Sequence, residues 1–153
     1  MLDAPQITET ADQPTAMIHL TVARSEIQNV MGPGLGEIMA ALDAQKISPA
    51  GPWFTHHLRM PTDTFDFEIC VPVNATIAAT GRVKPSQWPA MTVARAIYQG
   101  PYEGLGAAWG EFNAWVAASG HTPGSELWER YLKGPESGPD SGEYRTELNR
   151  PLI

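Results

Sequence analysis

Two matching apolar stripes restrict the folds open to this chain more than any other feature. Each stripe has four apolar residues at positions i, i+3, i+4 and i+7, and they are Leu35, Ile38, Met39, Leu42 and, 70 residues later, Leu105, Ala108, Trp109, Phe112. This spacing collects side chains on one face of a helix. We therefore expect one helix after Gly32-Pro33-Gly34, ending near Gln45, and a second over residues 102–119.

Extended segments surround each stripe in the same order. Apolar and polar residues alternate, with the period of a β-strand, before each stripe and twice after it. The predicted strands are residues 5–22, 53–60 and 65–73 around the first stripe, and residues 91–98, 126–133 and 143–148 around the second. Each half of the chain therefore reads as strand, helix, strand, strand (βαββ).

The correspondence between the halves predicts an internal duplication. Glu147 follows Glu68 by 79 residues and Gly124 follows Gly51 by 73 residues, so the offset grows along the chain as loop insertions would make it. We expect one domain over residues 1–153, with halves at about 5–73 and 89–151. The predicted class is α+β, an antiparallel sheet with two helices on one face and a concave ligand-binding face.

Composition excludes several functions. The formal net charge of -7 repels phosphate, so direct nucleic-acid binding is not expected. No apolar run is long enough for a membrane helix, and residues 1–15 lack the pattern of a signal peptide, which predicts a cytoplasmic protein. The single Cys70 lies in an apolar run, where a thiol behaves as a small hydrophobe.

Three short motifs together resemble the GyrI-like family, which includes the effector-binding domains of AraC-type and MerR-type transcription regulators. They are QGPYEGL at residues 99–105, LWERYL at residues 127–132, and the later Glu147 and Pro151. The resemblance extends over nearly the whole chain. It implies a tandem βαββ (SHS2-like) fold and, because the duplication already uses the chain, a freestanding member.

For function, the resemblance implies a multidrug-type pocket between the halves, where a carboxylate faces cationic aromatic ligands. Glu129 is the matching position, and we expect the ligand to be a hydrophobic small molecule that is cationic or polycyclic. Strand alternation independently places Glu129 on one face with Leu127 and Tyr131. The alternative for Glu129 is a solvated carboxylate paired with Arg130 or Lys133.

Aromatic residues are the candidate walls of that pocket, because rings bind cations and flat ligands through their π faces. The candidates are Tyr98, Trp128, Tyr131 and Trp53, each of which also suits a core. His56 is a further ligand-binding candidate, because a histidine that gains or loses a proton near neutral pH would change the charge of the ligand site. His56 and His57 are neighbours on a strand and point to opposite faces, so they cannot share one metal there.

Two other function classes stay open at this level. Some members of the family are similar to hydrolases that open strained electrophilic rings, in which case Glu129 and Tyr98 would be the catalytic pair. The chain could instead contact a protein partner, such as gyrase or a regulator, or form a homodimer. Related SOUL proteins bind haem, but the histidines here show no haem-attachment pattern, so neither cofactor nor metal is predicted.

Two remaining features receive structural interpretations. The string from Gly32 to Gly36 resembles a phosphate loop, but Pro33 removes an amide donor and the dinucleotide spacing is absent, which favours a helix-entry turn. Glu68 and Glu147 occupy equivalent positions in the two halves. That equivalence predicts a shared structural role at the strand ends.

Overall fold

A computed structural model describes residues 1–135 and 138–153, and these divide into two compact units. One unit is Ala11–Ala90, and the other combines Met1–Thr10 with Met91–Ile153. Within the described residues there are two α-helices and eight β-strands, and the strands pair antiparallel within each unit. The predicted α+β class is confirmed.

The Ala11–Ala90 unit contains the first βαββ set and one additional strand. Its strands lie in the order β5-β2-β4-β3, with β2 between its two antiparallel partners β5 and β4. The elements in chain order are β2 (Gln13–Ala23), α1 (Ile27–Ala44), β3 (Phe54–His57), β4 (Thr64–Pro72) and β5 (Lys84–Trp88).

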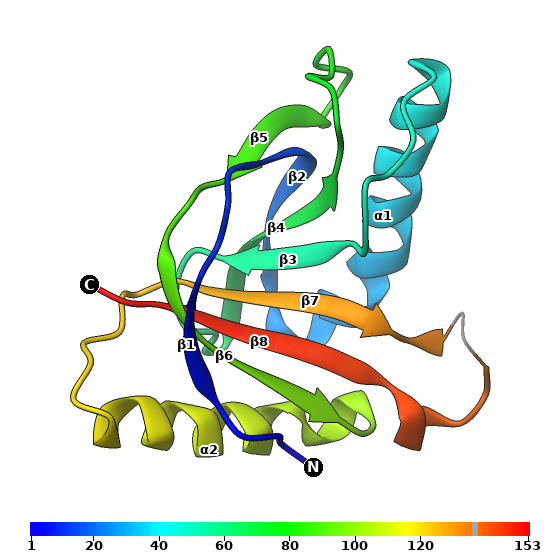
Figure 1. The fold of residues 1–153 in the computed structure, drawn as a ribbon. Helices are drawn as coiled ribbons and strands as arrows, with labels where there is room; N and C mark the ends of the chain where they lie inside the picture. The colour runs from blue at the N-terminus through cyan, green and yellow to red at the C-terminus, as the bar shows by residue number, and fades with distance from the viewer. Residues whose placement is uncertain (136–137) are drawn as a thin grey trace. The chain divides into compact units, whose positions relative to one another are not determined.

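The first apolar stripe packs α1 against one face of this unit's strands. Ile38 and Leu42 of α1 are buried against Ile18 of β2 and against Phe67 and Ile69 of β4. Alternate residues of β2 and β4 face the helix, because successive side chains of a strand point to opposite faces. Figure 1 shows α1 lying along β2 and β4.

The second unit repeats this plan with the second stripe. Its strands lie in the order β1-β6-β8-β7, and α2 lies on one face of them (Figure 1). Phe112 and Val116 of α2 share a buried cluster with Ala96 of β6 and Leu148 of β8. The elements in chain order are β1 (Gln6–Glu9), β6 (Thr92–Gln99), α2 (Leu105–Ala118), β7 (Leu127–Lys133) and β8 (Arg145–Pro151). The predicted βαββ duplication is therefore present, with α2 preceded by a 3₁₀ turn at Tyr102–Gly104.

Each unit receives its edge strand from the segment that leads into the other unit. β1 precedes β2 in the chain yet pairs with β6, and β5 precedes β6 yet pairs with β2. The prediction of one strand over residues 5–22 therefore needs correction, because residues 10–12 lie outside both β1 and β2. There the carboxylate of Asp12 accepts a hydrogen bond of 2.8 Å from the backbone N–H of Ala90.

The prediction that Gly32 to Gly36 form a helix-entry turn is wrong. Helix α1 begins at Ile27, so Pro33 lies inside it. Ile27, Val30 and Met31 pack against the buried cluster, and this apolar contact extends the helix before the glycines despite the missing amide of Pro33. Neither helix of the described residues is long and apolar enough to cross a membrane.

Candidate functional site

Glu129 lies in the middle of β7, on the face covered by α2. Its carboxylate accepts a hydrogen bond on each oxygen: Oε1 from the hydroxyl of Tyr131 at 2.8 Å and Oε2 from Nε1 of Trp109 at 2.6 Å. The side chain is half-buried, whereas Tyr131 and Trp109 are buried. A strand and a helix thus hold the carboxylate from two sides.

No cationic side chain forms an ion pair with Glu129 among residues 1–135 and 138–153. The two alternatives raised by the sequence pair elsewhere, Arg130 with Glu147 at 2.8 Å and Lys133 with Glu143 at 3.5 Å. Each carboxylate oxygen has a second lone pair, so Glu129 keeps capacity for a further partner.

The alternation of β7 explains how the chain builds this arrangement. Leu127 is buried in the core beneath α2, and the two-residue period then places Glu129 and Tyr131 on the same face, as predicted. Trp109 was assigned from the sequence only to the apolar stripe of α2. A buried indole N–H needs an acceptor, and that requirement is the signal that would have linked Trp109 to a nearby carboxylate.

Tyrosine side chains extend the site beyond the carboxylate. The ring of Tyr102 meets the ring of Tyr131 edge-on at 6.1 Å between centroids, and it lies 5.0 Å from the ring of Tyr144. Tyr98 belongs to the same face of β6, β8 and β7, because Thr146 pairs with Tyr98 on one side and with Tyr131 on the other. Tyr98 is buried, and its hydroxyl donates to the backbone carbonyl of Pro101 at 2.9 Å.

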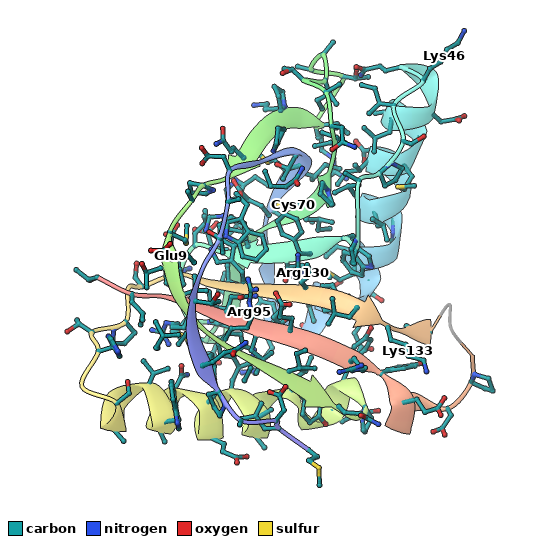
Figure 2. The ribbon with its side chains drawn as sticks, viewed as in Figure 1. Glu9, Lys46, Cys70, Arg95, Arg130 and Lys133 are labelled. Carbon is teal, nitrogen blue, oxygen red and sulfur yellow. The ribbon has the colours of Figure 1, made fainter. Side chains whose placement is uncertain are left out.

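Trp128, another predicted wall, is buried and points to the opposite face of β7 from Glu129. That face carries a charged network centred on Glu147, which accepts from Arg130 at 2.8 Å and lies 3.3 Å from Arg95. Asn149 completes the network: it donates to Glu147 and accepts from Arg95 at 2.6 Å. Figure 2 labels Arg95 and Arg130, which reach this network from β6 and β7.

The two remaining candidates, His56 and Trp53, belong to the Ala11–Ala90 unit. His56 is buried on β3, where Nδ1 lies 2.9 Å from Oε1 of Glu68, and Trp53 is half-buried against the core of that unit. Pairing places His56 opposite Glu68, just as Arg130 lies opposite Glu147. Both glutamates thus have a basic partner on the adjacent strand, as a shared structural role requires. Their predicted place at the strand ends is wrong for Glu68, which lies in the middle of β4.

This equivalence also identifies the counterpart of Glu129 in the Ala11–Ala90 unit. Thr55 precedes His56 as Glu129 precedes Arg130, and His57 corresponds to Tyr131. Thr55 Oγ1 lies 3.2 Å from Nε2 of His57, whose ring stacks on Phe67. The carboxylate is therefore present in one half only, and a hydroxyl occupies the equivalent position in the other.

The Ala11–Ala90 unit has a cavity of about 530 Å³ on its strands, lined by Met17, His19, Leu58, Glu68, Gly81, Arg82 and Lys84. Most of its charged groups are already paired, His19 with Asp66, Glu68 with His56 and Arg82 with Glu37. Cys70 of the same unit is buried, and this burial raises the pKa of its thiol (Figure 2). Among the described residues, no cluster of three His, Cys, Asp or Glu side chains could hold a metal ion.

Comparison with protein families decides the identity of the domain. The model of the GyrI-like small-molecule-binding domain matches residues 3–152. The chain belongs to the GyrI-like family. The resemblance noted in the sequence is therefore confirmed, and the Glu129 site lies in a GyrI-like small-molecule-binding domain.

Solved structures share the fold of this GyrI-like domain at low sequence identity. The C-terminal domain of EcmrR superposes with a TM-score of 0.87 at 23% identity, covering 98% of this chain and 97% of that one. In the EcmrR–DNA complex the match has a TM-score of 0.86 and 23% identity over 97% of this chain, which spans 57% of the EcmrR chain there. No curated protein sequence matches the chain.

Two more distant structures have the same fold. SAV2435 bound to tetraphenylphosphonium has a TM-score of 0.71 at 15% identity, with 99% of this chain and 94% of that chain covered. A hydrolase from Listeria innocua has a TM-score of 0.68 at 11% identity, with 97% and 91% covered. At these identities the likeness extends to the fold alone.

Proposed function

We propose that this GyrI-like domain binds a hydrophobic, cationic aromatic molecule, with Glu129 as the charge partner. The observation that carries the proposal is the pair of neutral donors on Glu129. Tyr131 and Trp109 orient the carboxylate without cancelling its charge, and no cationic side chain among the described residues does so. An oriented and uncompensated carboxylate in an aromatic setting favours a ligand that brings its own positive charge.

The surroundings of Glu129 suit the rest of such a ligand. Tyr131 and Trp109 contact the carboxylate and Tyr102 contacts Tyr131, so the carboxylate lies in an aromatic cluster. Aromatic rings attract cations and flat apolar groups. A lipophilic cation loses little on leaving water, because its charge is spread over apolar groups. Tetraphenylphosphonium, the molecule bound to SAV2435, is a ligand of this class and therefore a suitable probe.

The proposal is tested by titrating tetraphenylphosphonium against the wild type and Glu129→Gln by isothermal calorimetry and tryptophan fluorescence. We expect Glu129→Gln to lose tenfold or more in affinity, about 1.4 kcal/mol or above. Glu111→Gln is the matched control, because Glu111 is exposed on α2 and the substitution changes the net charge equally. Triphenylphosphine oxide, a neutral analogue, should bind the wild type and Glu129→Gln alike; equal affinity of tetraphenylphosphonium for both proteins would refute the role of Glu129.

A hydrolase is the second candidate function, and one contact favours it. A carboxylate hydrogen-bonded to a phenol at 2.8 Å is a pair able to move a proton, and a hydrolase has this fold. The phenol beside Glu129 is that of Tyr131, whereas the hydroxyl of Tyr98 donates to Pro101. Mass spectrometry after incubation with cyclopropane-containing or epoxide compounds would reveal turnover. If the compounds are recovered unchanged, binding is the function that the experiment supports.

A further inference from the structure

The hydroxyl of Tyr98 is enclosed by the turn that follows its strand. β6 ends at Gln99, and Tyr98 Oη donates to the carbonyl of Pro101 at 2.9 Å. Two glycines of the same turn lie against this hydroxyl. A Cβ added at Gly100 would lie 2.6 Å from Tyr98 Oη, and one added at Gly104 would lie closer still.

The glycines are needed here mainly for space. Gly104 has φ -86 and ψ -5, a conformation that alanine also adopts, so only the closeness of the Tyr98 hydroxyl excludes a side chain there. Gly100 has in addition a φ of +149, which disfavours other residues. We name the group of Gly100, Pro101 and Gly104 the Tyr98 socket.

We propose that Tyr98 is a positioning residue for the Glu129 site and acts through this socket. The inference rests on the proposed function for its effect on ligand binding. Its structural part rests on the contacts alone. Tyr98 does not touch Glu129 by any hydrogen bond of the described residues, so its influence passes through the turn that it holds.

The turn connects to both donors of the carboxylate. Tyr102, between Pro101 and Gly104, sets its ring against Tyr131, which donates to Oε1 of Glu129. Helix α2 begins directly after Gly104 and carries Trp109, which donates to Oε2. Fixing the turn on the Tyr98 hydroxyl therefore fixes the ring of Tyr102 and the start of α2 together.

The first test needs no ligand. In an NMR spectrum, the indole N–H of Trp109 reports its hydrogen bond to Glu129, and its signal is assigned as the one missing in Trp109→Phe. Tyr98→Phe should shift this signal in the direction produced by Glu129→Gln. Ser119→Ala is the control, because it also removes a hydroxyl-to-carbonyl hydrogen bond, that of Ser119 to Val116, at the opposite end of α2 from the turn. An unchanged Trp109 signal in Tyr98→Phe would overturn the proposal.

The second test examines the socket by compensation. Gly104→Ala places its Cβ directly against the Tyr98 hydroxyl, whereas the next atom of Tyr98, Cζ, lies 3.1 Å from that Cβ. Removing the hydroxyl relieves the closest contact, so Tyr98→Phe should raise the melting temperature of Gly104→Ala although it lowers that of the wild type. Additive losses in the double variant would contradict the socket. This test works even if Gly104→Ala alone is poorly folded.

The third test measures whether the Tyr98 socket affects ligand binding. Tyr98→Phe should weaken tetraphenylphosphonium binding about threefold to tenfold, the effect of losing one hydrogen bond. In the Glu129→Gln background the same change should have no further effect, since the group being positioned is gone. A loss that persists in that background overturns the proposal. If Glu129→Gln binds tetraphenylphosphonium as tightly as the wild type does, the proposed function fails instead. The two ligand-free tests still decide whether the Tyr98 socket positions the Glu129 site.

Discussion

Nε1 of Trp109 and Oε2 of Glu129 are 2.6 Å apart, a hydrogen bond that joins helix α2 to strand β7. The contact explains how one side chain can belong both to a core and to a site. The ring of Trp109 packs on Phe112 at 5.6 Å between centroids, while its N–H meets the carboxylate. An apolar stripe residue thus orients the group that we propose as the partner of the ligand.

The first prediction concerns this bond. Trp109→Phe keeps an aromatic ring but leaves Oε2 of Glu129 without its donor, which should cost about 1–3 kcal/mol of the free energy of unfolding. Urea denaturation measures the loss. Trp115→Phe is the control, because Trp115 packs against the same cluster and no hydrogen bond of its indole is seen among the described residues. Equal losses in the two variants would show that ring volume and not the hydrogen bond matters.

Periodicity was enough to predict the features that follow from one local pattern. The two stripes located both helices, and the two-residue period of β7 placed Glu129 beside Tyr131. Periodicity does not predict which distant segments pair in the sheet. Trp88 is the one large apolar residue of β5, so this strand depends on its hydrogen bonds with β2. Likewise, no pattern within residues 5–22 indicates that β1 pairs with β6.

The site was predicted in part for the same reason. Alternation gives the face of a strand residue, but it does not say which helix residue lies above it, so Trp109 was missed as a donor. The hydrogen bond of the Tyr98 hydroxyl was also not predictable, because its acceptor is a backbone carbonyl in a turn. The roles of Tyr98, Trp53, Trp128 and His56 in ligand binding stay predictions.

The second prediction compares the two equivalent glutamates. Glu147→Gln should destabilise the fold by about 3 kcal/mol, because it leaves Arg95 and Arg130 without their carboxylate in a largely buried network. Burial lowers the pKa of Arg95, Glu147 opposes this effect and Arg130 adds to it, so the loss of Glu147 removes the group that stabilises the buried charge. Glu68→Gln breaks one ion pair recorded among the described residues, that with His56, and should cost about 1 kcal/mol. Urea denaturation of both variants tests this order, and a larger loss for Glu68→Gln would contradict it.

The third prediction is a pH dependence at Asp66. The hydrogen bond from His19, at 2.6 Å, lowers the pKa of the Asp66 carboxyl below its usual 3.8, and Thr21 and Arg59 act in the same direction. A carboxyl with a lowered pKa stabilises the fold above its unfolded pKa, and this stabilisation disappears as the pH falls through the folded pKa.

Asp66→Asn should therefore lower the melting temperature at pH 6 and have little effect at pH 2.5. The effect at pH 6 should be small, because both partners are partly exposed. Asp43→Asn, an exposed carboxylate of α1, serves as control and should show no such difference. A loss at Asp66 that is equal at both pH values would argue against the His19 contact.

The fourth prediction concerns helix α1, which begins earlier in the chain than the sequence predicts. Gly36 lies inside α1, is exposed, and has open space where a Cβ would be, so Gly36→Ala should stabilise the fold by about 0.5–1 kcal/mol. Gly34 is the matched position on the buried face, where an added Cβ would lie 2.6 Å from Cδ1 of Ile69. Gly34→Ala gains the same helix propensity but must displace a side chain that is fully buried, so its net gain should vanish. Thermal unfolding of the two variants measures the difference, and equal stabilisation would mean that Ile69 repacks without cost.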